Sequence, residues 1–288
     1  MDEYEDRFWT SRDGLELHYR DYAGAAPAKA RPPVVCLPGL TRNARDFAEV
    51  AEHIAPGWRV ICPEMRGRGD SEYAKDPATY NPVQYVEDLR ELLAQLGIER
   101  FVAIGTSLGG LMTLAIAADE PGRIAGAVIN DVGPRLEPSG FQRIKDYIGQ
   151  GRSYPTWVHA ARALEESQAT AYPGKDLNFW IGMAKRLMTI SGNGRIVFDY
   201  DMKIAEPFME IEADALPDLW PGVEALRGRP VLVVRGALSD LFSAATMRDM
   251  LARLPEAEGL TLPGVGHAPL LTEPDSIAAI DRLLGEVA

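Results

Sequence analysis

The chain has 288 residues, of which 46% are hydrophobic and 25% are charged. This composition excludes global disorder, and the length is typical of an α/β core that carries an inserted subdomain. The 30 basic and 42 acidic residues give a formal net charge of −12, which argues against nucleic acid or an anionic membrane surface as a partner.

The N-terminal residues and the cysteines bear on location and redox chemistry. Residues 1–6 are acidic where an export signal would be basic and then apolar, so we expect a cytoplasmic protein. The longest weakly polar stretch, residues 102–118, is interrupted by Gly, Thr and Ser and is too short to span a membrane. Cys36 and Cys62 lie in apolar runs without metal-ligand spacing, so we expect buried free thiols and no metal site.

The first third of the chain predicts a hairpin followed by alternating strands and helices. Residues 7–22 contain an Asp-Gly turn between two strand-like segments, and His18 falls on the polar face of the second, which predicts a solvated side chain. Hydrophobic periodicity then predicts strands and helices in alternation over residues 33–37, 44–55, 60–65, 82–96 and 101–104. This alternation is typical of a mostly parallel sheet with crossover helices.

The segment Gly105-Thr106-Ser107-Leu108-Gly109 has the G-x-S-x-G pattern of a nucleophile elbow. An apolar strand precedes it and residues 108–119 predict a helix, so Ser107 falls on the sharp turn between them. Glycines on both sides permit a close approach of strand and helix, and Ser107 itself is expected in a strained conformation. This context favours a catalytic serine over a chance match.

After a further strand at 124–132, the alternation stops. Residues 134–220 contain helix-like segments but no clear strand pattern, and we interpret them as a mostly helical lid. The core would then comprise residues 1–133 and 221–288, with the sheet resuming at residues 230–236 and 259–262, each followed by a helix.

The lid is rich in aromatic residues, which suggests an apolar wall over the site. Trp157, His159 and Trp180 are the candidates for substrate contact. The alternative is that such rings build the lid's own small core.

A serine nucleophile needs a histidine within hydrogen-bond reach to accept its proton. His18 and His53 are predicted at the surface, and His159 falls in the lid. His267 follows the final strand, at the carboxyl edge of the sheet where Ser107 also emerges, and is therefore the expected base.

Two carboxylates are candidates to orient His267. Asp240 follows the strand at 230–236 and gives the chain order Ser, Asp, His, whereas Asp131 ends the strand after the elbow. We favour Asp240, because it lies on the strand before that of the histidine. The backbone N–H groups of Leu40 and Leu108 are the candidates for an oxyanion hole.

Five segments together resemble the α/β-hydrolase fold superfamily, in its lid-bearing serine hydrolase branch. They are Leu37-Pro38-Gly39-Leu40, the glycine-rich loop at 63–71, the elbow at 105–110, the segment 236–240 and Gly266-His267. The resemblance implies a mostly parallel eight-stranded sheet with the lid inserted after the sixth strand. It also implies Ser107, His267 and Asp240 as nucleophile, base and acid, and it disfavours dehalogenase and epoxide hydrolase chemistry, which use aspartate at the elbow.

We therefore hypothesise a cofactor-independent serine hydrolase that acts by acyl transfer on a small, largely apolar ester or lactone. The same triad would serve a C–C bond hydrolase or an acyltransferase. A hypothesis of a different class is a hydrolase-fold receptor that binds a small molecule and turns it over slowly.

Overall fold

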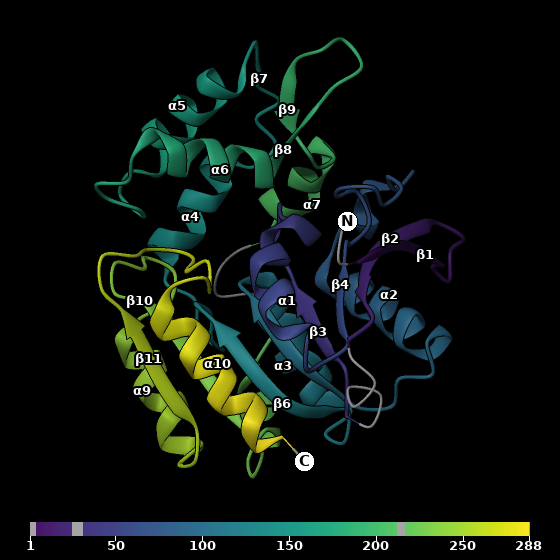
Figure 1. The fold of residues 1–288 in the computed structure, drawn as a ribbon, viewed down its shortest axis with the longest axis vertical. Coiled ribbons are helices and arrows are strands. Elements are labelled where there is room, and N and C mark those ends of the chain that lie inside the picture. The colour runs from purple at the N-terminus through teal and green to yellow at the C-terminus, as the bar shows by residue number, and fades with distance from the viewer. Residues whose placement is uncertain (1–3, 25–30, 212–216, 288) are drawn as a thin grey trace.

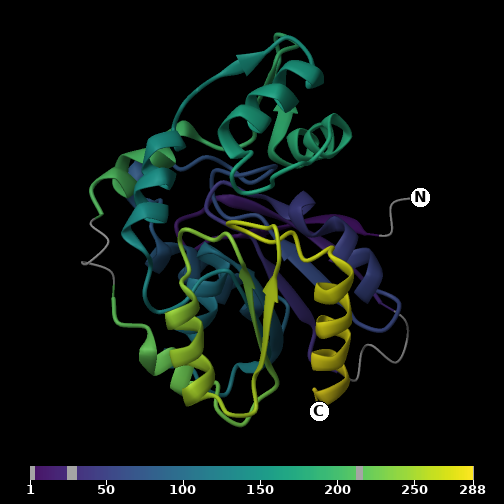
Figure 2. The same cartoon turned by 90° about the vertical axis from the view of Figure 1, so that its left-hand side faces the viewer.

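The computed structural model describes residues 4–24, 31–211 and 217–287. Its centre is an eight-stranded sheet with helices on both faces, and a largely helical segment lies over one end of the sheet (Figures 1 and 2). In spatial order the strands are β1 (Glu5–Thr10), β2 (Glu16–Tyr22), β4 (Val60–Pro63), β3 (Val34–Leu37), β5 (Phe101–Thr106), β6 (Ile124–Asn130), β10 (Val231–Gly236) and β11 (Glu258–Leu262).

The sheet is mostly parallel, as predicted. Strand β2 pairs antiparallel with β1 and with β4, and the remaining neighbours in the described sheet are parallel. The parallel strands therefore end at the same edge, which brings the loops after β3, β5, β6, β10 and β11 together. Loops at this edge form the ligand site in open α/β sheets.

The two faces of the sheet bury separate clusters because side chains alternate along each strand. Val35 and Leu37 face one cluster, whereas Val34 and Cys36 face the other. Helices α2 (Pro82–Gln95), α3 (Leu108–Asp119), α8 (Trp220–Ala225) and α9 (Ala244–Arg253) contribute to the first cluster, and η2 (Ala44–Phe47), α1 (Ala48–Ile54) and α10 (Pro274–Glu286) contribute to the second.

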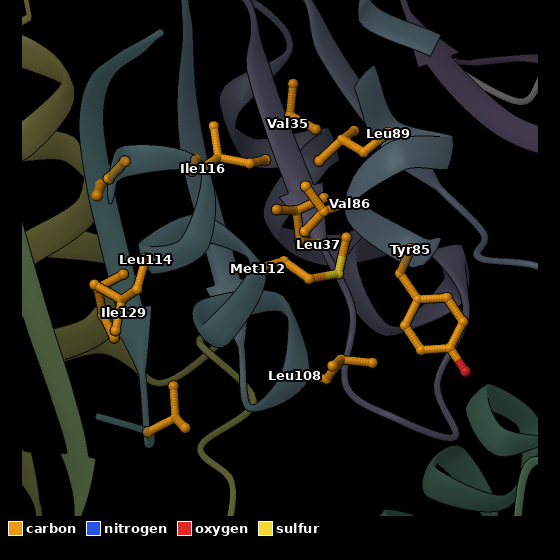
Figure 3. Close-up of a cluster of buried hydrophobic side chains, with 14 of the residues drawn as sticks. Val35, Leu37, Tyr85, Val86, Leu89, Leu108, Met112, Leu114, Ile116 and Ile129 are labelled. Atoms are coloured by element: carbon orange, nitrogen blue, oxygen red, sulfur yellow. The ribbon is translucent and has the colours of Figure 1, made fainter. Parts of the chain in front are cut away.

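Part of the first cluster lies between α2, α3 and the strands (Figure 3). The labelled side chains come from β3 (Val35, Leu37), α2 (Tyr85, Val86, Leu89), α3 (Leu108, Met112, Leu114, Ile116) and β6 (Ile129). Asn81 caps α2 by accepting a hydrogen bond from Gln84 N, and Pro82 opens the helix with a preset φ. Because Leu108 and Met112 belong to this cluster, the first turns of α3 pack on an apolar layer.

The segment between β6 and β10, residues 134–220, is called the inserted segment below. Its elements up to residue 211 are α4 (Pro138–Tyr147), β7 (Ser153–Tyr154), α5 (Trp157–Gln168), α6 (Leu177–Leu187), β8 (Met188–Ile190), β9 (Ile196–Phe198), η4 (Met202–Ile204) and α7 (Ala205–Met209). The helix-like segments of the sequence, near residues 139–148, 156–167 and 177–189, are present as α4, α5 and α6. The small antiparallel sheet β7-β9-β8 was not predicted, because strands of two or three residues carry no readable alternation.

The inserted segment is tied to the core where β9 ends. The Tyr80 hydroxyl, between η3 (Pro77–Thr79) and α2, donates to Asp201 Oδ2 at 2.7 Å, and Arg45 of η2 pairs with Asp199. Gly69 N and Asp201 N also form backbone hydrogen bonds across this junction, with Asp199 O and Gly67 O. These contacts fix one side of the inserted segment to the glycine-rich loop.

Two further expectations concern the cysteines and membrane spans. Cys36 and Cys62 are buried free thiols on neighbouring strands, as predicted, and burial raises the pKa of Cys36. Within the residues described, no helix combines the length and the apolar character that a membrane span requires.

The elbow gives a stability test. A Cβ on Gly109 would lie 2.0 Å from the carbonyl oxygen of Leu37, so Gly109→Ala should force α3 away from β3. We expect the free energy of unfolding to fall by at least about 2 kcal/mol. Gly285→Ala in α10 is the matched control, because its Cβ would meet no atom within 4 Å and alanine favours a helix. Urea unfolding curves in which the two variants are equally stable would contradict this account.

Candidate active site

Ser107 occupies the turn between β5 and α3. Its φ of 53° and ψ of −114° form a conformation that is unfavourable for a residue with a side chain. The turn is possible because Gly105 and Gly109 allow contacts that no Cβ would permit, with Gly105 packed on the backbone of Gly109 and Gly110. The sharp turn lifts the serine out of the strand at the carboxyl edge of the sheet.

Ser107, His267 and Asp131 form a hydrogen-bonded line. His267 Nε2 lies 3.0 Å from Ser107 Oγ, and His267 Nδ1 lies 2.8 Å from Asp131 Oδ2. With Nδ1 protonated, the ring donates to the Asp131 carboxylate and accepts from the serine hydroxyl. The geometry is that of a general base held in one tautomer by a carboxylate.

The Asp131 carboxylate is fully buried and held by three donors. Oδ1 accepts from Gly236 N at 2.7 Å, and Oδ2 accepts from Ser239 Oγ at 2.7 Å as well as from His267. Its backbone takes a φ of 54° directly after β6, and its N–H donates to Val234 O of β10. These contacts fix the carboxylate in the plane that the imidazole needs.

The loop after β3 lies against the serine. A Cβ built on Gly39 would be 3.7 Å from Ser107 Cβ, and the carbonyl of Leu40 accepts two hydrogen bonds from Arg68, at 2.9 and 2.7 Å. Leu108 is the first residue of α3, and the first N–H groups of a helix have no intrahelical acceptor. Leu40 thus belongs to the loop that packs on Ser107 and Leu108 directly follows the serine, and the guanidinium of Arg68 holds the Leu40 backbone.

A cavity of about 320 Å³ opens onto Ser107 and His267, between the core and the inserted segment. Its wall includes three arginines and two aspartates, together with rings from α4, β7, β9 and the residues just after β9. The charged members are Arg42, Asp46, Arg143, Asp146 and Arg152, and the rings are Tyr147, Tyr154, Phe198 and Tyr200. The wall is more polar than the aromatic content of the inserted segment suggested.

Comparison with known proteins places the chain in a family. The family model described as the alpha/beta hydrolase fold matches residues 32–274. The chain belongs to the α/β hydrolase fold family. Several of its relatives are named hydrolases, and the chain is accordingly a hydrolase.

Three similar proteins illustrate the range of sequence identity to this chain. The 3-hydroxybutyrate-oligomer hydrolase of Cupriavidus necator is 36% identical over 263 residues, covering 88% of this chain and 87% of that protein. The crystal structure of an alpha/beta hydrolase from Novosphingobium aromaticivorans is 61% identical, with a TM-score of 0.95 and full coverage of both chains. A putative hydrolase from Rickettsia typhi shares the fold at 22% identity, with a TM-score of 0.86 and 99% coverage of both.

In this hydrolase, the sequence-based preference for Asp240 as the partner of His267 is wrong, and the alternative, Asp131, makes the hydrogen bond. Asp240 lies in the loop beyond β10 and forms a two-point ion pair with Arg143 of α4, including Nη2 to Oδ1 at 2.9 Å. Burial raises the pKa of Asp240, but hydrogen bonding and the charge of Arg143 outweigh it and leave the pKa below its ordinary value. Arg143, from the inserted segment, takes up this carboxylate.

The three candidates for substrate contact do not line the cavity as far as the described residues define it. Trp180 is 1% exposed and packs edge-on against Phe179 and near Tyr172. Trp157 packs against the same cluster, and His159 is exposed beside Thr156. The alternative interpretation, that such rings build the core of the inserted segment, holds for both tryptophans.

The residues that line the cavity in their place were not predicted from the sequence. Arg143 and Tyr147 are one helical turn apart on α4, inside the helix that the periodicity predicted. That spacing was the available signal, since it places both on one face. Arg42 lies three residues after Gly39, and its stem would be 3.3 Å from a Cβ at that glycine.

The prediction that His18 is solvated is also wrong. The residue is 1% exposed, and its ring lies between two carboxylates, with Nδ1 2.9 Å from Glu64 Oε2 and Nε2 2.9 Å from Asp6 Oδ1. Glu64 also accepts hydrogen bonds from Ala44 N and Asp70 N, so the pair braces the start of η2 behind the Leu40 loop. The loop that follows β4 covers this face of β2, which strand alternation alone does not reveal.

The surroundings of His18 also contain a third potential metal ligand. The ligand atoms of His18, Glu64 and Asp70 lie within 4.8 Å of one another in the described part of the chain. Both ring nitrogens of His18 are already hydrogen-bonded to carboxylates, which is the arrangement of a structural ion pair.

The ion pairs of His18 with Glu64 and Asp6 make the free energy of unfolding depend on pH. Burial lowers the pKa of His18, but Glu64, Asp6 and the more distant Asp70 outweigh it and leave the pKa above the ordinary value. A raised folded-state pKa contributes stability that is complete below about pH 6.5 and declines as the pH rises through the folded pKa. We expect this decline, at most about 1.4 kcal/mol per pH unit, to be smaller in His18→Gln.

The measurement is the free energy of unfolding in urea between pH 5.5 and 8.5. Glu64→Gln should reduce the same slope, because it removes a carboxylate that faces the imidazole. Both variants should be less stable than the wild type at pH 5.5. Slopes that match the wild type in both variants would refute the ion-pair account.

Proposed function

We propose that the chain is a serine hydrolase that cleaves small carboxylic esters, with Ser107 as nucleophile, His267 as general base and acid, and Asp131 as the carboxylate that orients it. The observation that carries this proposal is the line Ser107–His267–Asp131 facing a cavity of about 320 Å³. A cavity of this size holds a small ligand rather than a polymer chain.

In the proposed reaction, Ser107 Oγ attacks the ester carbonyl carbon while His267 Nε2 accepts the hydroxyl proton. The N–H groups of Leu40 and Leu108 stabilise the oxyanion of the tetrahedral intermediate. His267 then returns the proton to the leaving alkoxide, which departs as an alcohol. A water molecule releases the acyl group as a carboxylic acid by the same steps and regenerates the serine.

Asp131 contributes by holding His267 in the tautomer with Nδ1–H toward the carboxylate and Nε2 toward the serine. It also stabilises the imidazolium that forms when Ser107 attacks. Burial of the carboxylate excludes water from this interaction and strengthens it. Because Gly236 N and Ser239 Oγ keep the carboxylate in place, it needs no rearrangement during the reaction.

The substrate proposed first is a short oligoester of a hydroxy acid. It is favoured by the 36% identity over most of both chains to the 3-hydroxybutyrate-oligomer hydrolase of Cupriavidus necator. The polar cavity wall suits such a ligand, because each unit carries an ester carbonyl that accepts hydrogen bonds. We also propose that the inserted segment acts as a lid, since residues of α4, α5 and β9 form much of the wall.

Replacing the nucleophile tests the proposal. Ser107→Ala should lower kcat on p-nitrophenyl butyrate and on 3-hydroxybutyrate dimers and trimers by about 10³-fold or more, with an unchanged circular dichroism spectrum. Ser191→Ala, in the turn between β8 and β9, is the matched control and should retain full activity. Wild-type turnover in Ser107→Ala would exclude this nucleophile.

A fluorophosphonate probe separates the enzyme from a slow receptor. In the enzyme it should label Ser107 stoichiometrically, and the same preparation should turn over many equivalents of ester. Labelling without multiple turnovers on any ester, lactone or oligoester would contradict a hydrolytic function for this site.

The two aspartates give the second test. Asp131→Asn should lower kcat by about 10³-fold or more, because an amide in place of the carboxylate favours the wrong tautomer of His267. Asp240→Asn should keep kcat within about tenfold, because Asp240 pairs with Arg143 rather than with the base. Steady-state kinetics on one neutral ester decide between them. The reverse ranking would return the acid role to Asp240.

A further inference from the structure

The inserted segment contacts the His267 loop on both sides of the histidine. Gly266 N, just before it, donates to Ala171 O at 2.6 Å. The Tyr172 hydroxyl donates to Ala268 O, just after it, also at 2.6 Å. Two adjacent residues, between α5 and α6, therefore hold the peptide groups that flank the base.

The contact is too close for any larger group. A Cβ on Gly266 would lie 2.7 Å from Ala171 Cα and 3.0 Å from Ala171 Cβ, so only glycine allows the two backbones to meet. Tyr172 is 2% exposed and packs against Phe179 and Trp180. Burial raises the pKa of Tyr172 to about 12, so its hydroxyl is a proton donor at neutral pH.

The same turn reaches the cavity. Gln168, at the end of α5, lines the cavity, and its carbonyl oxygen accepts from Ala171 N at 2.9 Å and from Tyr172 N at 3.1 Å. Residues 168–172, called the clamp below, thus run from the cavity wall to the loop that carries His267. Four hydrogen bonds thus connect a residue of the cavity wall to the loop that carries the base.

We propose that the clamp positions His267 for proton transfer, with Tyr172 as its key positioning residue, so that the inserted segment completes the catalytic site as well as covering it. This inference rests on the proposed role of His267 as base. Tyr172 contacts the carbonyl oxygen of Ala268, the residue after His267, and not the reacting atoms. Its effect is therefore on the placement of the imidazole between Ser107 and Asp131.

The physical reason is the short reach of the imidazole. Both of its hydrogen bonds need placement within a fraction of an ångström, and a displacement of about 1 Å can cost about 10²-fold in rate. The His267 loop leaves the sheet after β11, an edge strand with a partner on one side only. The clamp therefore adds contacts from the inserted segment to those that the loop makes with the sheet, such as the hydrogen bond from Asn130 Nδ2 to Pro269 O at 2.9 Å.

The test compares two tyrosine-to-phenylalanine variants. Tyr172→Phe removes only the hydroxyl that holds Ala268 O and keeps the ring in its cluster. Tyr80→Phe is the matched control, because the Tyr80 hydroxyl is a buried donor that ties the inserted segment to the core at Asp201, outside the described cavity wall. Both variants should lose thermal stability, since each leaves a buried acceptor without its donor.

The two variants should differ in everything that reports on His267. In Tyr172→Phe we expect kcat on p-nitrophenyl butyrate to fall about tenfold with KM within twofold, and fluorophosphonate labelling of Ser107 to slow in parallel. The downfield proton resonance of His267 Nδ1–H, recorded by NMR without substrate, should broaden or shift. Tyr80→Phe should keep wild-type kcat, labelling rate and resonance.

Gly266→Ala provides a second route, because its Cβ pushes the clamp away while Tyr172 is intact. It should reproduce the altered His267 resonance and the slower labelling. Wild-type kcat and resonance in Tyr172→Phe would overturn the inference, as would equal losses of kcat in the Tyr172 and Tyr80 variants. If the wild type hydrolyses no ester, the proposed function fails, but the resonance still tests whether the clamp positions His267.

Discussion

The arrangement of the site depends on one close approach, between the first turn of α3 and strands β3 and β5. Gly109 meets the carbonyl of Leu37, and Gly105 meets the backbone of Gly109 and Gly110, at separations that no Cβ would allow. This contact holds Ser107 in its positive-φ conformation at the N-terminus of a buried helix. The strand order then places the other groups beside Ser107. Strand β3, on one side of β5, leads into the Leu40 loop, and β6, on the other side, leads into Asp131.

The features that local sequence determines were predictable. The elbow, the alternating strands and the helices α1 to α6 depend on hydrophobic period, glycines and caps within a few residues of one another. Ser107 and His267 were predicted for the same reason, since each lies at a strand end in a glycine-rich turn. The structure brings them within 3.0 Å although 160 residues separate them in the chain.

The acid could not be chosen in this way, because Asp131 and Asp240 follow neighbouring strands and both reach the same edge. Tertiary contacts distinguish the two aspartates. Gly236 N and Ser239 Oγ turn Asp131 toward His267, and Arg143, from a helix about 100 residues earlier in the chain, takes up Asp240. Ser239 itself comes from the segment that made Asp240 attractive, so this segment does contact the Asp131–His267 pair, but through Ser239 and not through Asp240.

The ligand-facing surface was the least predictable part, because net charge and aromatic content average over the whole chain. The acidic excess of 12 charges lies on a molecule whose cavity wall carries three arginines. Two of these have carboxylate partners, Arg42 with Asp46 and Arg143 with Asp240. Charges more than about 8 Å away across solvent are largely screened at physiological ionic strength, so the charges of the cavity wall bear more on a bound ligand than the net charge of the chain. The two pairs place guanidinium N–H donors in the cavity wall at little net charge, which agrees with the proposed ester substrate. Trp180, by contrast, is buried against Phe179 and Tyr172 and belongs to the core of the inserted segment.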